Sequence, residues 1–443
     1  MTENKLNYIL GLFRKFYDLP GGVSISYDTT DHTGITILNQ AGDFFEAKRP
    51  LDTSNIRWKT WKNRSIPILF APDVDSELIK SGPSSSVIPY DILASSFYFL
   101  SNWQEYTCDN TDQYDRFPYK ESLQYKLDIP CVPVVNYYFD ILKTAIERTY
   151  NIKLSSIFSR DESYSIALTH DIDTLHSGWL QEGYAALKEG QIIQAAIIGL
   201  QRFFGDDPWF NLNELAELEQ KYGISGSYFF LSRNRVINDI EHADYSISSQ
   251  KLQEQLELLN HANAEIGIHG SYGAHLDDNQ LEREVNKIGA SIQGGRFHFL
   301  SFEVPRTPYV LDRAGLTYDS TLGFSEQIGF RNGIAHPFLL YDLLNDRPTT
   351  VWEIPLVIMD TTLKHSQYMG IHQDDVMETI KPVLSELMKF RGNVAILWHN
   401  SYYSNFKYSG WKEVLIKIIE KIQSDGGTIS TALELVPDFQ QGT

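Results

Sequence analysis

Two carboxylates lie two residues apart in the segment THDID at 169–173, which continues the apolar run SIALT at 165–169. In an extended segment Asp171 and Asp173 point to the same side. One carboxylate can then hold a metal ion while the other takes a proton from a water that the ion activates. Asp is also a preferred helix N-cap residue, so the pair could instead cap a helix. The segment predicts either a metal-dependent hydrolytic centre or a pair of caps.

Two histidine-containing segments could complete such a centre. EIGIHGSYGAH at 265–275 places His269 at the end of a predicted strand and His275 six residues later. Neutral imidazole is a good ligand for zinc, nickel, cobalt or iron, and a set of Asp and His ligands leaves positions for water and substrate. ILWHN at 396–400 ends an apolar run in His399, where burial and a neighbouring carboxylate can tune the pKa for acid–base chemistry. A structural role at a strand end is the alternative for each histidine.

The segment RFHFL at 296–300 alternates polar and aromatic residues. As a strand it would direct Arg296 and His298 to one face and the phenylalanines to the other. A buried arginine must be paired, and a site carboxylate such as Asp171 is a natural partner. A structural ion pair is the alternative interpretation.

These residues need a scaffold, and the chain after residue 163 predicts one. Short β-rich runs alternate there with helical patterns, which is typical of βα architectures, where chemistry is built at the ends of the strands. The predicted strands are 165–169, 226–231, 265–269, 296–300, 351–357 and 393–399. The predicted helices are about 186–203, 211–222, 248–262, 279–291, 374–390 and 411–424, the fourth with Asp277 as its N-cap.

The first part of the chain has a different texture. Short apolar runs mix with loop signals up to about residue 155, and we expect a smaller α/β domain over 1–155 before the larger one over 160–440. Helices are expected at the N-terminus, over 91–106 and over 134–150. No residue constellation here predicts chemistry, and its aromatic residues are expected to form core.

Composition excludes several classes of protein. The 443 residues carry 38 Lys and Arg against 57 Asp and Glu, a net charge of −19, which disfavours general binding of nucleic acid or anionic membranes. Two cysteines, Cys108 and Cys131, cannot form a disulfide scaffold or a multi-cysteine metal site, although one disulfide is open. The sequence shows neither an apolar run of about 18 residues nor a signal-peptide pattern, so we expect no membrane span and a cytoplasmic location.

Taken in order, the motifs resemble those of the NodB-type polysaccharide deacetylases, carbohydrate esterase family 4. THDID is similar to the first motif of that family, EIGIHGSYGAH to the second, RFHFL to the third and ILWHN to the fifth. YDSTLGF at 318–324, followed by FR at 330–331, lies where the fourth is expected. The resemblance covers about residues 160–440 and implies an α/β fold, a distorted (β/α) barrel preceded by the smaller α/β domain.

The resemblance also implies roles for individual residues. Asp171 would be the catalytic base, Arg296 would orient it, and His399 would be the general acid. Asp173 and His269 would bind a divalent metal, zinc in the first place, with cobalt, nickel or iron as alternatives.

One ligand of the family pattern is missing. The second motif normally carries another histidine four residues after the first, and this position is Gly273. His275 can take its place if the loop bends, and His298 can reach in from the next strand. A weak or absent metal site is the third possibility. The first motif is altered too, with His170 for an aromatic residue and Ile172 between the acids.

The function that the resemblance implies is removal of an N-acyl group, in the first place acetyl, from an amino sugar or polysaccharide. Candidate substrate-binding residues are Tyr272, Trp398, Asp319 and Arg331. The alternatives are a catalytically impaired carbohydrate-binding or scaffold barrel and an amidase acting on a non-sugar substrate. The N-terminal segments FYFLSNWQEY and YDRFPYKES resemble an uncharacterised domain that accompanies such deacetylases in bacteria, and it could bind substrate, mediate assembly or cover the barrel mouth.

Overall fold

One long sheet organises the larger part of the chain. The computed structural model describes residues 1–29, 33–156, 163–234, 236, 239–289, 291–404 and 406–437. The strands of this sheet are β7 (Ser165–Ile172), β8 (Ser227–Leu231), β9 (Glu265–Gly270), β10 (Gly294–Phe297), β11 (Tyr318–Asp319), β12 (Phe338–Asp342), β13 (Arg347–Glu353), β14 (Leu356–Met359), β15 (Asn393–Leu397) and β16 (Thr428–Ser430). The helices are α6 (Gly178–Lys188), α7 (Ile192–Phe204), α8 (Leu212–Lys221), α9 (Gln250–His261), α10 (Asp278–Ile288), α11 (Arg306–Ala314), α12 (Asp360–Lys364), α13 (Val376–Phe390) and α14 (Trp411–Ser424).

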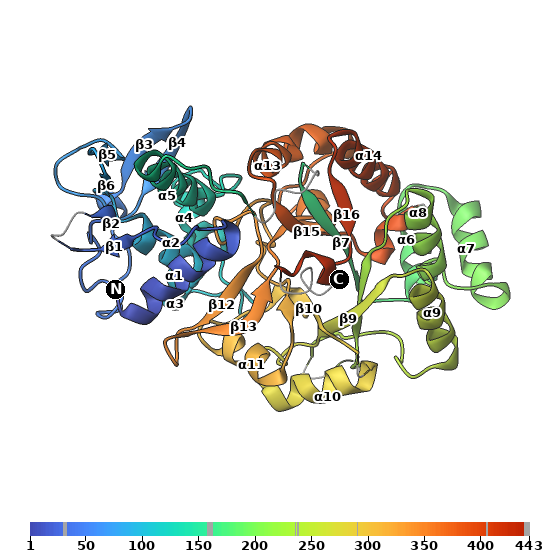
Figure 1. Cartoon of the computed structure of the whole chain (residues 1–443). Helices are drawn as coiled ribbons and strands as arrows, with labels where there is room; N and C mark the ends of the chain where they lie inside the picture. The colour runs from blue at the N-terminus through green and yellow to red at the C-terminus, as the bar shows by residue number, and fades with distance from the viewer. Residues whose placement is uncertain are drawn as a thin grey trace.

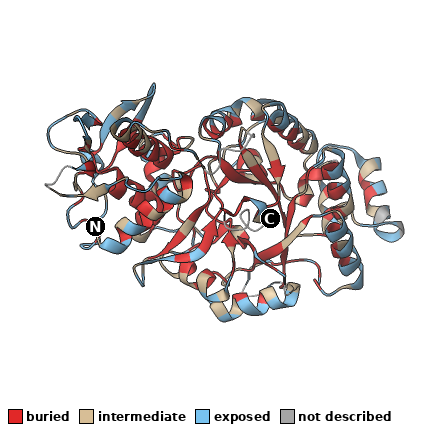
Figure 2. Cartoon of the chain, viewed as in Figure 1, coloured by how far each residue is buried: buried red, intermediate tan, exposed pale blue. Residues whose placement is uncertain are grey.

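The sheet is almost entirely parallel. Its strands follow the order β12, β13, β11, β10, β9, β8, β7, β15 and β14, and β16 pairs with the first residues of β7. Only β12 and β13 pair in antiparallel fashion. The sheet curls while helices surround it (Figure 1), and its strands are buried along most of their length (Figure 2), as parallel strands covered on both faces should be. The expected α/β class is confirmed, and a curled, almost entirely parallel sheet stands where a distorted (β/α) barrel was expected.

Most of the predicted elements of this region are present. The strands expected at 165–169, 226–231, 265–269 and 393–399 are β7, β8, β9 and β15, and the helix expected at 411–424 is α14. Asp277 caps α10, accepting a hydrogen bond from the Gln280 N–H at 3.1 Å.

Two predicted elements are wrong because a single residue interrupts the regular structure of each. The strand expected at 351–357 is two strands, β13 beside β11 and β14 beside β15. Pro355 lies between them and has no N–H for a ladder hydrogen bond. The helix expected at 186–203 is the pair α6 and α7, because Gly190 adopts a φ of 76° after the first helix and ends it.

The segment RFHFL is only partly a strand. β10 ends at Phe297, and the next three residues form a 3₁₀ turn (His298–Leu300). Phe299 and Leu300 have φ values of 61° and 58°, a left-handed conformation that is uncommon for residues other than glycine. His298 therefore stands on a turn rather than on the same strand face as Arg296.

The N-terminal region contains a second, smaller sheet. β1 (Ile25–Tyr27), β2 (Gly34–Ile37), β6 (Ser85–Ile88) and β5 (Lys80–Ser81) form it in that order, and β3 (Arg57–Trp61) pairs with β4 (Arg64–Ile68). The helices are α1 (Glu3–Phe16), α2 (Ile92–Leu100), α3 (Trp103–Tyr106), α4 (Leu123–Lys126) and α5 (Val134–Tyr150). The helices expected at the N-terminus and over 134–150 are confirmed. The one expected over 91–106 is divided into α2 and α3, because Asn102 between them is left-handed.

The N-terminal region packs on the antiparallel edge of the large sheet. Tyr8 of α1 donates a hydrogen bond to the Leu339 carbonyl of β12 at 2.6 Å, and Phe97 of α2 packs edge-on against Tyr341. One continuous hydrophobic cluster extends from α1, α2 and α5 into the large sheet. A buried ion pair also links the two regions: Arg331 binds both carboxylate oxygens of Glu105, at 2.9 and 2.8 Å.

Two further expectations concern cysteines and membranes. Cys108 and Cys131 are both free thiols, so the disulfide left open by the sequence is not formed. Within the described parts of the chain, no helix combines the length and apolar character needed to cross a bilayer.

Replacing Arg331 by Met is expected to destabilise the protein, because Glu105 would be left as an unpaired buried carboxylate. Breaking a buried ion pair from one side costs about 3–5 kcal/mol, and urea unfolding followed by tryptophan fluorescence should show a lower midpoint. The double variant Arg331→Met, Glu105→Met should regain most of this stability. Equal midpoints for the wild type and the single variant would show that the pair does not stabilise the contact between the regions.

Candidate active site

A cavity opens where several parallel strands of the large sheet end. Its volume is about 210 Å³. It is lined by the predicted site residues Asp171, Asp173, His269, His298 and His399, together with Tyr114, Arg116, Phe299, Leu300, Ser325, Met359, Thr361, Tyr368 and Leu397. The carboxyl ends of parallel strands meet at one edge of a sheet, and this common edge brings together motifs that are more than 200 residues apart in the chain.

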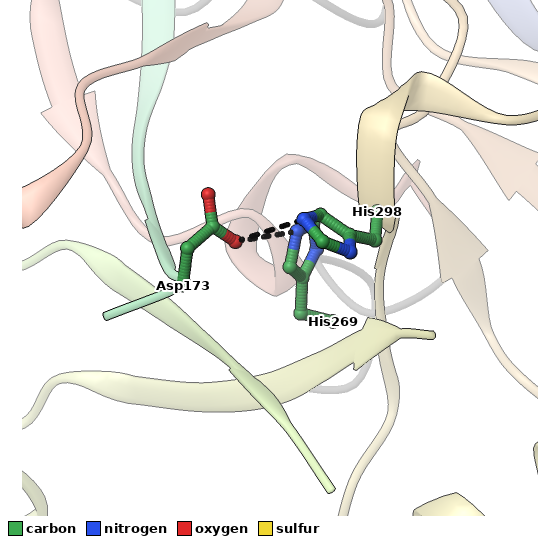
Figure 3. A group of neighbouring side chains, drawn as sticks. All are labelled: Asp173, His269 and His298. Carbon is green, nitrogen blue, oxygen red and sulfur yellow. Dashed lines mark ion pairs between the residues drawn. The ribbon is translucent and has the colours of Figure 1, made fainter. Parts of the chain in front are cut away.

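Three of the predicted residues form a compact group of potential metal ligands (Figure 3). The Oδ1 atom of Asp173 lies 3.2 Å from Nε2 of His269 and 3.6 Å from Nε2 of His298. All three ligand atoms lie within 4.8 Å of one another. Ligands of a tetrahedral zinc ion, each about 2.0–2.1 Å from the metal, would be roughly 3.3 Å apart. The spacing of this group therefore fits a divalent ion.

The polar atoms of the group support the same conclusion. Among the described residues, Asp173 Oδ1 is buried without a hydrogen-bond partner, which is costly for a carboxylate oxygen unless a cation satisfies it. Burial alone would raise the pKa of Asp173, but His298 and His269 hold it well below its usual range. Burial lowers the pKa of His298 to about 3, so this imidazole is neutral and has a lone pair for a metal.

His269 is oriented by the backbone of the neighbouring strand. Its Nδ1 atom lies 2.9 Å from the Arg296 carbonyl oxygen, and these two residues are register partners in β9 and β10. Donation from Nδ1 leaves Nε2 as the ligand atom, which is the usual outer-shell arrangement at metal sites. Although burial alone would lower the pKa of His269, Asp171 and Asp173 raise it.

Asp171 is held by a buried arginine. The Nη1 atom of Arg296 lies 2.8 Å from Asp171 Oδ1 and 3.0 Å from the Thr169 hydroxyl. The other guanidinium nitrogens bind the carbonyl and hydroxyl oxygens of Ser320. Asp171 Oδ2 is left facing the group of ligands, 3.8 Å from Nε2 of His269. The carboxylate is thus fixed beside the place where a metal-activated water would stand.

His399 follows β15, the strand paired with β7, and faces Asp173 of the ligand group. Its Nε2 atom is 3.7 Å from Asp173 Oδ2, and its Nδ1 atom is 2.8 Å from Asp360 Oδ1. Asp360 also accepts a hydrogen bond from the His399 backbone N–H. Burial would lower the pKa of His399, but the adjacent Asp360 carboxylate raises it to about 9. The imidazole is thereby kept protonated and able to donate a proton.

Asp360 was not predicted from the sequence. It directly follows the apolar run LVIM at 356–359, which forms β14. We had expected that strand to end at Val357, and a correct strand boundary would have marked Asp360 as another acid at a strand end.

The structure places His275 apart from the group of potential metal ligands. Its side chain is buried between the rings of Tyr272 and Phe297, and burial lowers its pKa to about 4. Neither ring nitrogen has a hydrogen-bond partner in the part of the chain that the structure describes. Gly273 turns the loop with a φ of 89°, and this turn leads His275 away from Asp173. Of the two alternatives left open by the sequence, His298 is the one that lies in the group.

The four predicted substrate-binding residues do not line the cavity. Trp398 is fully buried in the core. Asp319 is buried beside Glu353, whose pKa is raised well above its usual range by burial and by this neighbouring acid. Arg331 is bound to Glu105, and the Tyr272 hydroxyl is hydrogen-bonded to Asp115. Sequence proximity to a motif therefore did not place these residues on the cavity wall, because it does not determine which way a side chain faces.

The N-terminal region contributes to the cavity wall through Tyr114 and Arg116. Both belong to the segment YDRFPYKES at 114–122, in the part of the chain where the sequence predicts no chemistry. They are far from every motif in sequence, so no local signal could have placed them here.

Comparisons with known proteins give one family match and several similar solved structures. Residues 5–151 match the model of a family of unknown function, DUF7033. No curated protein matches the sequence. Similar solved structures include a putative polysaccharide deacetylase from Mycobacterium smegmatis, at 14% identity and a TM-score of 0.42 over 64% of this chain and 92% of that chain. Puue allantoinase is 12% identical, with a TM-score of 0.41 over 64% of this chain and 91% of that chain. A probable polysaccharide deacetylase from Pseudomonas aeruginosa PAO1 is 13% identical, with a TM-score of 0.41 over 63% of this chain and 92% of that chain.

We expect the wild-type protein to bind one zinc or cobalt ion, and His298→Ala to weaken binding by more than about 100-fold. That loss exceeds the roughly 10- to 100-fold typical of a lost outer-shell partner, because a direct ligand is removed. Competition with a chromophoric chelator would measure it. His275→Ala removes an equally buried imidazole outside the group and should leave affinity unchanged. The reverse pattern would identify His275 as the third ligand.

Proposed function

We propose that this cavity is the active site of a metal-dependent hydrolase that removes an N-acyl group, acetyl in the first place, from an amino sugar. The proposal is carried by one observation. The group Asp173, His269 and His298 lies between a carboxylate bound to a buried arginine and a histidine bound to a buried carboxylate.

A divalent ion held by Asp173, His269 and His298 would polarise the amide carbonyl and lower the pKa of the attacking water. Zinc suits this ligand set, as do cobalt, nickel and iron. Asp171 takes the proton from the water as its oxygen bonds to the carbonyl carbon. Arg296 keeps Asp171 in place by binding its other oxygen at 2.8 Å.

His399 acts on the leaving group. An amine leaves poorly as an anion, so the nitrogen must be protonated as the C–N bond breaks. Asp360 holds His399 protonated and directs its Nε2 atom toward the cavity. The products are the carboxylic acid and the free amine.

The paired acid and base favour an enzyme over a binding or scaffold module. A sugar-binding site has no need for a buried arginine on one carboxylate and a buried carboxylate on one histidine. Both arrangements cost desolvation energy, and both serve proton transfer.

A small non-sugar amide is the second candidate substrate. The cavity of about 210 Å³ is smaller than the roughly 300–1,000 Å³ of typical ligand pockets. A compact acylated amine therefore fits it, whether or not the amine belongs to a sugar.

Acetate release from N-acetylglucosamine oligomers should require metal and Asp171. Chelation is expected to abolish release and added zinc or cobalt to restore it. Asp171→Asn should lower kcat by about 10²- to 10⁴-fold, the usual contribution of a general base, while metal content stays stoichiometric. Asp277→Asn, at an exposed helix cap where Asn serves equally well, is the control. A metal-loaded protein that releases no acyl group from sugars or from small amides would contradict the hydrolase assignment.

The role of His399 should appear as a dependence on the leaving group. His399→Ala is expected to lose about 10²- to 10⁴-fold in kcat on an alkyl acetamide. The loss should be much smaller on an acetanilide with an electron-poor ring, because that amine leaves without full protonation. An equal loss on both substrates would exclude His399 as the general acid.

A further inference from the structure

His298 differs from the other proposed histidine ligand, His269, in how it is held. The Nδ1 atom of His269 is hydrogen-bonded to a backbone carbonyl, whereas Nδ1 of His298 is buried with no hydrogen-bond partner among the residues that the structure describes. His298 also stands on a 3₁₀ turn instead of a strand. Its ring orientation must therefore come from packing.

The packing against His298 is a continuous stack of side chains. The Phe299 ring lies 3.8 Å from the His298 ring at an interplanar angle of 20°. The Tyr114 ring lies 4.4 Å from Phe299 at 10°, and the Arg116 guanidinium lies 5.0 Å from the Tyr114 ring. Stacked rings and a cation over an aromatic face are both attractive. The stack begins at a proposed metal ligand and ends in the N-terminal region.

The backbone of the turn is fixed by the same loop. Arg116 donates a hydrogen bond to the Phe299 carbonyl at 3.0 Å, and Ser301 donates one to the Tyr114 carbonyl at 3.4 Å. The left-handed φ of 61° at Phe299 is unfavourable for a residue with a side chain. Such a conformation persists only where its surroundings hold it, and the loop supplies these contacts.

The loop that holds the turn, residues 112–116, is itself held together by hydrogen bonds. Both carboxylate oxygens of Asp112 are used inside it. One accepts the backbone N–H groups of Tyr114 and Arg116, at 2.8 and 3.1 Å, and the other binds the Arg116 side chain at 2.7 Å. Arg116 is therefore a buried, paired cation. It supports the stack and is not free to bind a substrate anion.

We propose that Tyr114 and Arg116 are positioning residues that fix the His298 ring through Phe299, so that the N-terminal region determines the metal affinity of the site. This inference rests on the proposed function, because it takes His298 as a metal ligand. It assigns to the loop at 112–116 the orienting task that a hydrogen bond performs for His269.

The test compares two tyrosines of the N-terminal region that both pack on aromatic residues of the larger region. Tyr114 stacks on Phe299, while Tyr119 packs on Phe324 with ring centroids 5.0 Å apart and lies outside the cavity wall. Tyr114→Leu should weaken zinc and cobalt binding by about 10- to 100-fold, the range for lost outer-shell support. Tyr114→Phe keeps the stack and should bind as the wild type does. Tyr119→Leu loses a comparable contact and should leave affinity unchanged.

A spectroscopic readout separates positioning from general stability. Cobalt absorption bands report ligand geometry, so they should shift in Tyr114→Leu and not in Tyr119→Leu, whatever each variant does to the melting temperature of the metal-free protein. Phe299→Leu is a second way to interrupt the stack and should reproduce the shift if Tyr114→Leu does not fold.

The outcomes distinguish the two claims. A wild-type protein that binds no metal would overturn the proposed function. A wild type that binds metal, together with a folded Tyr114→Leu or Phe299→Leu of unchanged affinity and spectrum, would overturn only the positioning role. Equal losses in Tyr114→Leu and Tyr119→Leu would overturn it as well, because they would show that any weakening of the contact between the regions is sufficient.

Discussion

The buried guanidinium of Arg296 is the interaction on which the site depends. The guanidinium binds Asp171 and Thr169 of β7 and Ser320 just after β11. The backbone carbonyl of Arg296 accepts a hydrogen bond from His269 of β9. A buried arginine is tolerated only when its donors are satisfied, so these strands must keep their parallel register for the cation to remain buried. The same register brings the proposed base and two of the proposed ligands to one edge of the sheet.

The proposed base and the proposed acid have partners of opposite charge. Asp171 is bound to the Arg296 guanidinium, whereas His399 is bound to the Asp360 carboxylate, which raises the pKa of its imidazole. The two groups lie at or just after the ends of the paired strands β7 and β15, and their different partners suit the different roles that we propose for them.

Sequence patterns predicted the parts of the site that follow from strand ends. Asp171, Asp173, His269 and His399 each terminate an apolar run, and parallel strands bring such ends together. The choice between His275 and His298 could not be made, because it depends on a turn at Gly273 and on a left-handed Phe299, which have no periodic signature. Trp398 and Arg331 do not line the cavity for a related reason: adjacency in sequence does not show which residues face a cavity. Tyr114 needed a contact between residues nearly 200 positions apart.

The stack from Arg116 to His298 also bears on how such a chain can change over evolutionary time. A substitution at Tyr114 alters the surroundings of a residue encoded far away, so it persists only alongside a compatible residue at Phe299. The continuous hydrophobic core between α1, α2 and β12 imposes a similar restriction on the residues that form it. We therefore expect the N-terminal region and the large sheet to change together, because exchange of either one would leave the shared core and the stack without matching residues.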